Sequence, residues 1–324
     1  MGRTLCILFL GGLAMLLAGC GGSDGGGVSD PDKIFTIAGT VSLSGGGVVS
    51  GATMTLSGGS SPAVVTTDSD GNFSFTGLAN GNYVLTPSKT TYTFTPENTA
   101  LKVQGVNLVN VDFAATTTLL QGLIAYYPFS GNANDTSGNG HDGTVNGATL
   151  IADRFGSPDG AYNFNGSTDY IAVPNSNSLN LGASYTLSAW IFQRSASAVY
   201  GYRILDKQTA GACDGWNFDT YDGSTGRRLR MDVACPWTIS NTAYSLNQWH
   251  HVLVAVSSGA VTFYLDGVAD GSASVVSTPS NSLDLYIGAC HPNFSSYSFD
   301  GIMDDIRIYD RALSSIEIQA LSGH

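Results

Sequence analysis

Hydrophobic and polar residues alternate along several short segments between residues 34 and 115. The period of two begins in segment 35–43 and returns in segment 52–56, after a Gly-rich stretch. Successive side chains of a β-strand point to opposite faces, so this period is typical of strands with one buried face. Asp70-Gly71 is predicted to form a hairpin turn. The alternating strand positions are Phe35, Ile37, Gly39, Val41, Leu43, Ala52, Met54, Leu56, Phe73, Phe75, Tyr83 and Leu85, and Val109, Val111 and Phe113 are predicted to close the domain.

The same period returns between residues 120 and 324. Asp266-Gly267 supplies a hairpin turn directly after one alternating segment. Trp190 and Trp249 stand within apolar strands of this region, so we assign both rings to packing rather than to stacking on a ligand. The pattern predicts two packed sheets, in which Val252, Val254 and Val256 oppose Leu253 and Ala255, and Val261, Phe263 and Leu265 oppose Thr262 and Tyr264.

One short helix is predicted after the final strand. Ser314 and Glu317 have the S-x-x-E spacing of a capping box, in which each side chain accepts a hydrogen bond from the backbone amide of the other residue. Gly323 provides a suitable C-terminal end for this helix. Helical periodicity is otherwise nearly absent, so we predict an all-β chain.

An apolar stretch from Leu5 to Leu17 follows Arg3. It has the length of a signal peptide core and is short for a membrane span, which predicts export. The run Leu17-Ala18-Gly19-Cys20 resembles the lipobox of bacterial lipoproteins, which implies a signal peptide at 1–19 and a lipid anchor on Cys20. Gly21, in place of an aspartate, then favours the outer membrane of a bacterial cell envelope. In the alternative, the segment is an ordinary secretory signal and Cys20 has no role.

Composition adds a tether and argues against one class of partner. Residues 20–33 are rich in Gly, Ser and Asp and nearly free of apolar residues, which is typical of a flexible linker. The formal net charge is −12, and no cluster of Lys or Arg compensates for it. Phosphate binding needs a basic face, so we do not expect nucleic acid as a partner. A chain of 324 residues with this strand pattern is predicted to form two β domains.

The first predicted domain covers residues 34–115. Its runs GATMTL (51–56), TDSDGNFSFTGL (67–78) and GNYVL (81–85) resemble carboxypeptidase regulatory-like domains. This resemblance implies a Greek-key, prealbumin-like β-sandwich that serves as a spacer or stalk. Asp68, Asp70 and Asn72 lack the ligand spacing and the distal glutamate of an EF-hand, so we assign them to turns rather than to calcium.

The second predicted domain covers residues 120–324 and carries a series of short motifs. They are FSGNANDTSGNGHDG (129–143), FNGSTDYIAVP (164–174), YTLSAWI (185–191), WHHV (249–252), YLDG (264–267) and FDGIMDDIRIYDRALS (299–314). Together they resemble a LamG-like, concanavalin A-like jelly-roll domain. The resemblance implies a two-sheet sandwich whose loops recognise a ligand.

The chain lacks the catalytic carboxylates of enzymes that this domain resembles. Laminarinase-like glycosidases use a strand with the motif E-x-D-x-E, whose alternate carboxylates face one way. The only glutamates here are Glu97, in the first domain, and Glu317, in the capping box. Asp304 and Asp305 are adjacent, so alternation predicts that they point to opposite sheet faces. The motifs of alginate lyases, serine hydrolases and zinc proteases are also missing from the sequence, and we predict that the chain is not an enzyme.

Calcium is the metal that best suits this chain, because it takes oxygen ligands from loops. In concanavalin A-like domains a structural ion often ties the first strand region to the last one. Asp135 and Asp305 fall in the matching motifs, and the carbonyl of Gly160 is a third candidate ligand. In the alternative, Asp135 caps a turn and Asp305 pairs with Arg307 or Arg154.

Export favours a disulfide among Cys213, Cys235 and Cys290, because the reducing buffer of the cytosol is absent outside the cell. Segment 215–233 is predicted to form a hairpin that turns near Ser224, which places Cys213 opposite Cys235. A bridge there would rigidify the hairpin by constraining the unfolded chain. Cys290 is then left over, either buried, reduced, or replacing one member of the pair, and the sequence leaves this connectivity open.

Aromatic and acidic residues concentrate between Tyr200 and Trp237. Flat rings beside carboxylates suit sugars, which present an apolar face and a rim of hydroxyl groups. In the alternative, half of these aromatic residues belong to the core and the rest decorate loops. The candidate ligand-binding residues are Tyr202, Trp216, Tyr221, Trp237 and Asp219, with Asp214 and Asp222 nearby.

The sequence supports three hypotheses of function. In the first, an outer-membrane-anchored surface lipoprotein binds a carbohydrate or a surface protein through its second domain, without catalysis, and the first domain raises it from the membrane. In the second, the same fold carries an aspartate-based site that degrades polysaccharides. In the third, the chain is a purely structural cell-surface protein. We favour the first hypothesis because of the shortage of glutamates.

Overall fold

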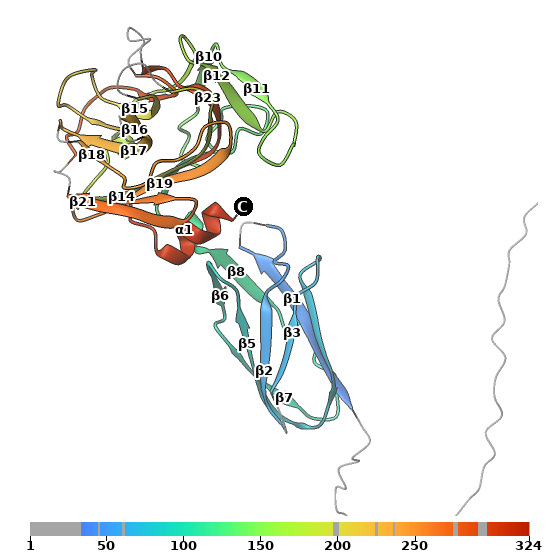
Figure 1. Ribbon diagram of the computed structural model, residues 1–324. Helices are drawn as coiled ribbons and strands as arrows, with labels where there is room; N and C mark the ends of the chain where they lie inside the picture. The colour runs from blue at the N-terminus through green and yellow to red at the C-terminus, as the bar shows by residue number, and fades with distance from the viewer. Residues whose placement is uncertain are drawn as a thin grey trace, which may run out of the picture.

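The structure, a computed structural model, describes residues 34–44, 46–59, 62–196, 201–223, 226–235, 237–274, 278–290 and 297–323. The predicted signal peptide (1–19), Cys20 and the tether (20–33) lie outside the described residues. Within these ranges, no helix has the length and apolar character needed to cross a membrane. Two β domains follow one another along the chain, and a short helix lies at their junction (Figure 1).

The first domain is a sandwich of two four-stranded sheets, with the strand orders β4-β1-β8-β6 and β3-β2-β5-β7. Strands β1 and β8 pair in parallel, and the other neighbours pair antiparallel. The strands are β1 (Phe35–Leu43), β2 (Thr53–Gly58), β3 (Ala63–Thr66), β4 (Asn72–Leu78), β5 (Gly81–Ser88), β6 (Tyr92–Thr95), β7 (Thr99–Val103) and β8 (Phe113–Thr117).

The alternation in the sequence places the core of this domain correctly, with one exception. Ile37, Met54, Phe73 and their alternating neighbours are buried between the two sheets. Of the residues predicted to close the domain, Val109 and Val111 precede the last strand, which begins at Phe113, and Val109 is 62% exposed. A turn lies at Asp70-Gly71, where the carboxylate of Asp68 accepts hydrogen bonds from the amides of Asp70 (2.9 Å) and Asn72 (2.8 Å). The predicted hairpin there is wrong, because β3 and β4 on either side of the turn belong to different sheets.

The second domain is a jelly-roll sandwich of a seven-stranded sheet, β10-β13-β22-β15-β16-β17-β18, and an eight-stranded sheet, β11-β12-β23-β14-β19-β20-β21 with β9 paired to β23. The strands are β9 (Leu123–Tyr127), β10 (Thr144–Asn146), β11 (Thr149–Ile151), β12 (Ala161–Asn165), β13 (Tyr170–Val173), β14 (Ser184–Gln193), β15 (Arg203–Lys207), β16 (Trp216–Gly223), β17 (Gly226–Val233), β18 (Trp237–Ile239), β19 (Trp249–Ser257), β20 (Ala260–Leu265), β21 (Val268–Ser274), β22 (Leu285–Ile287) and β23 (Asp300–Tyr309), with a 3₁₀ turn η2 at Asn177–Leu179.

Strand β19 shows how the period of two separates the faces of the eight-stranded sheet. Val252, Val254 and Val256 point into the core between the two sheets. Leu253 and Ala255 point to the other face, where they pack with residues of helix α1 (Ser315–Ser322). The all-β prediction, with a Greek-key sandwich before a jelly roll, is therefore confirmed. The hairpin at Asp266-Gly267 is also confirmed, and both residues have the positive φ of a type I′ turn, 51° and 78°.

The junction between the domains is built around α1 and a connecting 3₁₀ turn, η1 (Thr118–Leu120). Ser314 and Glu317 form the predicted capping box, and the amide of Gly323 closes the helix by donating to the carbonyl of Gln319. Leu119 of η1 packs on the same cluster as the helix. Arg311 donates to the carbonyls of Thr118 and Gln121, each at 2.8 Å, and so fastens the connector to the second domain.

Candidate ligand-binding face

Strands β16 and β17 give the seven-stranded sheet one apolar face and one polar face. Their antiparallel register pairs Asn217 with Asp232, Asp219 with Arg230, and Tyr221 with Arg228. Directly paired residues share a face, so these polar side chains lie together on the side away from the core. The opposite side chains pack between the sheets: Trp216, Phe218, Leu229, Met231 and Val233. We call the polar side the outer face of the seven-stranded sheet.

A buried ion-pair network lies at the centre of this outer face. Asp219 is fully buried and pairs with Arg203 and with Arg230, whose Nε lies 2.7 Å from its Oδ1. Arg203 also pairs with Asp206, with 2.8 Å between Nε and Oδ2, and donates to Asn217 Oδ1 at 2.9 Å. Opposite charges that satisfy one another in this way offset part of the cost of removing each from water.

Burial dominates the protonation of this network. It raises the pKa of Asp206 to about 7, against the opposing attraction of Arg203. Burial likewise lowers the pKa of Arg230. Both shifts disfavour the charged form, but only that of Asp206 affects its charge at neutral pH, because an arginine keeps its proton there.

Several polar atoms near the network lack a hydrogen-bond partner among the described residues. They include Asn217 Nδ2, Asp232 Oδ1 and Gln208 Oε1, each of which is buried as an atom. A buried donor or acceptor in a folded protein nearly always has a partner in the protein, in water or in a ligand. These atoms are closed to solvent, so they mark polar groups inside the sheet rather than contacts open to a ligand.

An aromatic pair lies at the edge of the same sheet. Trp237, on edge strand β18, is 50% exposed and stacks on Tyr221 of β16 with 5.4 Å between ring centroids and 26° between ring planes. The guanidinium of Arg230 lies 6.0 Å from the centroid of Tyr221. The two rings lie nearly parallel to each other beside the charged network. We call Trp237 and Tyr221 the aromatic pair.

The structure separates the sequence-predicted binding residues into three groups. Trp216 and Asp219 are both fully buried, one in the core and one in the network, so assigning them to a ligand-contacting surface was wrong. Tyr202 packs beside the core, and its hydroxyl is 3.0 Å from Ser195 Oγ. Tyr221 and Trp237 lie together. Sequence reasoning missed Arg228 and Arg230, although their alternation with Leu229 and Met231 was a usable signal.

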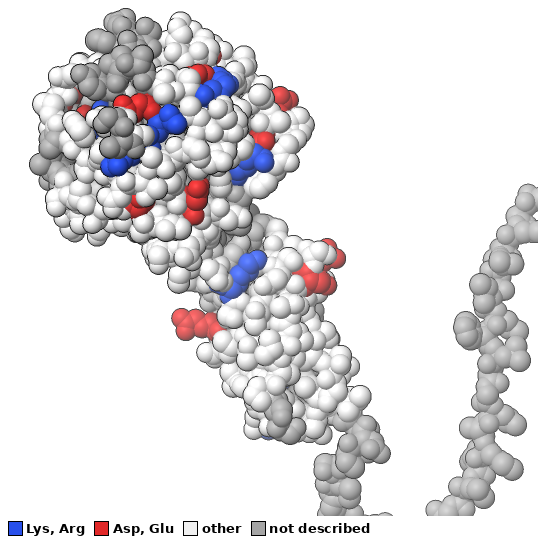
Figure 2. Space-filling view, viewed as in Figure 1, with Lys and Arg blue, Asp and Glu red and all other residues white. Residues whose placement is uncertain are grey.

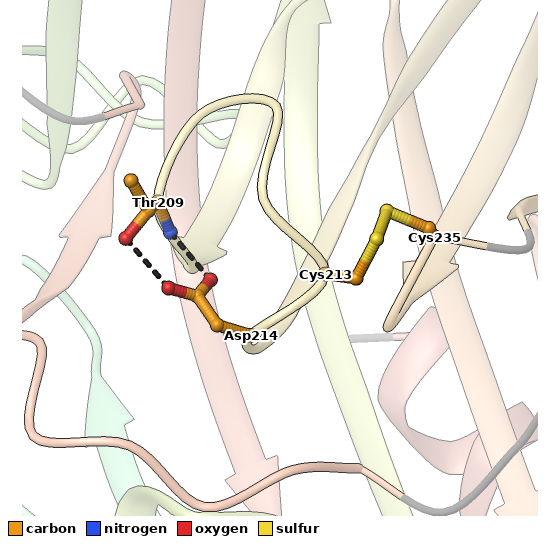
Figure 3. Close-up of a disulfide and its surroundings, with 4 residues drawn as sticks. All are labelled: Thr209, Cys213, Asp214 and Cys235. Carbon is orange, nitrogen blue, oxygen red and sulfur yellow. Dashed lines mark hydrogen bonds between the residues drawn. A yellow bond between two sulfur atoms is a disulfide. The ribbon is translucent and has the colours of Figure 1, made fainter.

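The predicted disulfide between Cys213 and Cys235 is confirmed, with 4.8 Å between Cα atoms (Figure 3). It joins the segments that enter β16 and leave β17, so it closes the base of the hairpin. Nearby, Asp214 accepts hydrogen bonds from the amide and hydroxyl of Thr209 at 2.9 and 2.7 Å. The predicted turn at Ser224 lies outside the described residues. Cys290 is buried outside this disulfide, and burial raises the pKa of its thiol to about 12.

The candidate calcium ligands already have protein partners. Asp135 accepts hydrogen bonds from the amides of Tyr126, Ser137 and His141 and from the hydroxyl of Ser137, at 2.8–3.0 Å. These hydrogen bonds lower its pKa, although burial alone would raise it. Asp305 pairs with Arg154 at 3.2 Å and with Arg307 at 2.9 Å. A calcium ion would have to displace some of these hydrogen-bond donors. Asp135 and Asp305, in the conformation that the structure shows, therefore do not fit a calcium ion.

Gly160 was predicted to bind calcium through its backbone carbonyl oxygen. A Cβ added at Gly160 would come within 2.9–3.1 Å of the side chain of Asp153, so this glycine allows a close approach. No group of three or more His, Cys, Asp or Glu side chains suited to a metal occurs within the described ranges. The role of calcium stays a prediction.

The expected separation of Asp304 and Asp305 on opposite faces is wrong. Asp305 is an extra residue in β23, because the register with β14 shifts between Ser188 and Trp190, and its φ is 54°. Such a bulge re-aims a side chain. Both carboxylates consequently pair with the guanidinium of Arg154. The two acids serve a shared ion pair on the eight-stranded sheet, not on the outer face of the seven-stranded one.

Two family models match the chain. Residues 36–116 match the carboxypeptidase regulatory-like domain, and residues 165–319 match the laminin G-type model of the concanavalin A-like lectin/glucanases superfamily. The chain therefore carries both domains that its motifs resemble, in the expected order.

One curated relative shares part of the sequence. Chitinase ChiA of Flavobacterium johnsoniae is 33% identical over 166 residues, which make up 47% of this chain and 9% of the chitinase. The shared region is thus a small part of that enzyme.

The second domain is similar in fold to a domain of known structure. Domain 4 of AbnA, a GH43 extracellular arabinanase from Geobacillus stearothermophilus, in complex with arabinotriose, has a TM-score of 0.51 at 22% identity, over 62% of this chain and 98% of that one. The binding domain of Paraclostridial Mosquitocidal Protein 1 has a TM-score of 0.49 at 19% identity, over 63% of this chain and 52% of that one.

Proposed function

We propose that this chain is a lipid-anchored surface protein whose second domain binds a carbohydrate chain without cleaving it. The observation that carries the proposal is the aromatic pair, Trp237 stacked on Tyr221, beside a polar sheet face. Sugar rings pack their apolar faces on such aromatic surfaces while their hydroxyl groups bond polar neighbours. Asp232 is a suitable neighbour, because it is only partly buried and pairs directly with Trp237 in the strand register.

Two comparisons support this proposal. The laminin G-type match places the second domain in a superfamily of lectins and glucanases. The arabinanase domain of the same fold is in complex with arabinotriose, an oligosaccharide. The shortage of glutamates supports the non-catalytic part of the proposal. Glu317 is the only glutamate in the sequence of the second domain, and its carboxylate accepts hydrogen bonds from Arg311 and Ser314.

A glycan array and polysaccharide pull-downs test the proposal, with the full chain purified in detergent. We expect the wild-type chain to bind a subset of polysaccharides and Trp237→Ala to lose that binding, because the sugar would lose its stacking surface. Phe155→Ala is the matched control, since Phe155 is an exposed aromatic side chain (69%) in the connection between β11 and β12. Blank glycan arrays, or full binding by Trp237→Ala, would count against the proposal. Release of reducing sugar from any bound polysaccharide would overturn its non-catalytic part.

The lipid anchor at Cys20 is tested separately in cells. We expect the wild-type chain in the membrane fraction, labelled by a fatty acid, and Cys20→Ala in the soluble or secreted fraction. Cys6→Ala is the matched control, because it removes the other cysteine of the N-terminal apolar segment. Equal labelling of wild type and Cys20→Ala would exclude the anchor. In this proposal the first domain acts as a spacer between the membrane and the binding domain.

Calcium at Asp135, Asp305 and Gly160 is a further point to test. An ion that binds only the folded chain raises the melting temperature by mass action. Thermal unfolding in chelator and in excess calcium measures this effect. A rise that disappears in Asp135→Asn would assign the ion to this site, and identical melting temperatures would remove calcium from the proposal.

A further inference from the structure

Arg228 is the exception among the arginines that the structure describes, because it has no carboxylate within ion-pair distance. Its Nε is buried as an atom and has no hydrogen-bond partner in the described ranges. The others all pair with an acidic side chain: Arg154, Arg194, Arg203, Arg227, Arg230, Arg307 and Arg311. A guanidinium carries five N–H donors and stays charged at all physiological pH values, so Arg228 has donors to offer.

Arg228 belongs to the same surface as the aromatic pair. The register of β16 and β17 places it directly opposite Tyr221, and Tyr221 stacks on Trp237. Paired residues of neighbouring strands lie on one face about 5 Å apart at Cβ. A ring that stacks on Trp237 would therefore have its substituents within reach of a guanidinium.

Two of the three carboxylates on β16 and β17 are already neutralised by arginines. Asp219 pairs with both Arg203 and Arg230, and Asp222 pairs with Arg227 at 3.9 Å. Basic side chains gather over the region of β15–β17, with acidic side chains between them, although the chain as a whole has a net charge of −12 (Figure 2). Within the described residues, Arg228 is the one arginine of β16–β17 without an ion pair, and Asp232, which pairs with Trp237 in the register of β17 and β18, is the one carboxylate of these strands without one.

We propose that the carbohydrate bound on this face is acidic and that its carboxylate or sulfate group hydrogen-bonds to the guanidinium of Arg228 while its ring stacks on Trp237. This inference rests on the proposed carbohydrate-binding function. Carboxylate and sulfate oxygens both match the two parallel N–H groups of a guanidinium, and such charge-assisted pairs are the strong hydrogen bonds of protein sites. The hydroxyl groups of a neutral sugar can also accept from a guanidinium, but these hydrogen bonds are weaker because the acceptor carries no charge.

The test compares acidic polymers with neutral counterparts of the same backbone. The probes are polygalacturonate with its fully methyl-esterified form, and dextran sulfate with dextran, each on a biosensor at low salt with the full chain in detergent. We expect an acidic polymer to bind the wild type at least about tenfold more tightly than its neutral counterpart. Preference for polygalacturonate assigns a carboxylate, and preference for dextran sulfate assigns a sulfate.

Substitutions then assign the preference to Arg228. Arg228→Gln should lower the affinity for the acidic polymer by about tenfold and leave the neutral one unchanged, and Arg228→Lys should retain part of it. Arg227→Gln is the matched control, because it removes the same charge from the adjacent residue, which faces Asp222. Melting temperatures confirm that each variant is folded.

The outcomes separate this inference from the proposed function. Equal binding of acidic and neutral polymers, lost in Trp237→Ala and kept in Arg228→Gln, overturns the acidic ligand and leaves carbohydrate binding standing. Equal losses in Arg227→Gln and Arg228→Gln overturn the specific role of Arg228. No binding to any glycan overturns both.

Discussion

The carboxylate of Glu317 accepts hydrogen bonds from both terminal nitrogens of Arg311, with 3.0 Å between Nη1 and Oε2 and 2.8 Å between Nη2 and Oε1. Arg311 also donates to the carbonyl of Thr118 in the connector, and Glu317 accepts from the amide of Ser314 in the capping box. One ion pair thus joins the C-terminal helix to the chain that links the two domains. Burial alone would raise the pKa of Glu317, but the hydrogen bonds from Arg311 and Ser314 lower it to about 2.

Loss of this charge should weaken the second domain at low pH. The pKa of Glu317 in the folded chain lies below its ordinary value of 4.5, so its stabilisation is present above pH 4.5 and is lost as the pH falls toward 2. We expect Glu317→Gln to be less stable at pH 6 by about 1–3 kcal/mol, and to lose less further stability on acidification. Thermal unfolding between pH 6 and pH 2 measures both effects. Glu97→Gln, at an exposed position, is the control and should match the wild type.

Two buried aspartates, Asp206 and Asp304, should make the stability of the chain fall as the pH rises toward neutral, which is opposite to the effect of Glu317. Burial raises the pKa of Asp206 and of Asp304 to about 7, against the attraction of Arg203 and Arg154 respectively. A raised pKa means that the folded state binds the proton more tightly, so this contribution to stability is full below pH 3.8 and is lost as the pH rises through 7. We expect the free energy of unfolding in urea to be higher at pH 5 than at pH 8. Asp206→Asn should reduce that difference, and an unchanged difference in this variant would contradict the assignment.

Breaking the disulfide should loosen the β16–β17 hairpin. Cys213 and Cys235 are separated by 22 residues, and closing a loop of that size stabilises a fold by roughly 3 kcal/mol in the chain-entropy description. We expect the double variant Cys213→Ser/Cys235→Ser to melt at a lower temperature than the wild type. A reductant should lower the melting temperature of the wild type and leave that of the double variant unchanged. Equal sensitivity of both proteins to the reductant would argue against this bridge.

Two tryptophans of the same region should respond differently to truncation. Trp216 is fully buried between the sheets, so Trp216→Ala should cost about 3–5 kcal/mol of stability through the cavity that it leaves. Trp237 is half exposed, so Trp237→Ala should change stability by no more than about 1 kcal/mol. Urea unfolding measures both values. Similar losses in the two variants would mean that Trp237 is a structural residue rather than part of a binding surface.

Strand alternation was enough to predict both sandwiches from the sequence. Val252, Val254 and Val256 occupy the core, and the residues between them occupy the other face, because a strand without a bulge keeps its period of two. Asp305 shows where this reasoning fails. One extra residue in β23 shifts the alternation, and nothing in a run of polar and apolar letters marks the residue that bulges.

The candidate binding face was harder to predict, because the type of a residue does not specify to which side of the sheet its side chain points. Trp216 and Trp237 are equally aromatic, yet one points into the core and the other lies on an edge strand. Their neighbours do carry the distinction: Trp216 shares its parity with Phe218, while Asn217, Asp219 and Tyr221 share the other. Arg228 was overlooked because its significance is the lack of an acidic partner, which only the paired strands reveal.

Helix α1 and the connector pack on the eight-stranded sheet, whereas the aromatic pair belongs to the seven-stranded sheet. Packed sheets are about 10 Å apart, so the thickness of the sandwich separates the attachment to the first domain from the proposed binding surface. This arrangement gives clearance: a long polymer lying across β16–β18 would pass over the domain without colliding with its neighbour. Because α1 docks on the eight-stranded sheet, the seven-stranded sheet stays accessible. The proposed surface could therefore bind an internal segment of a long polymer as well as a terminal sugar.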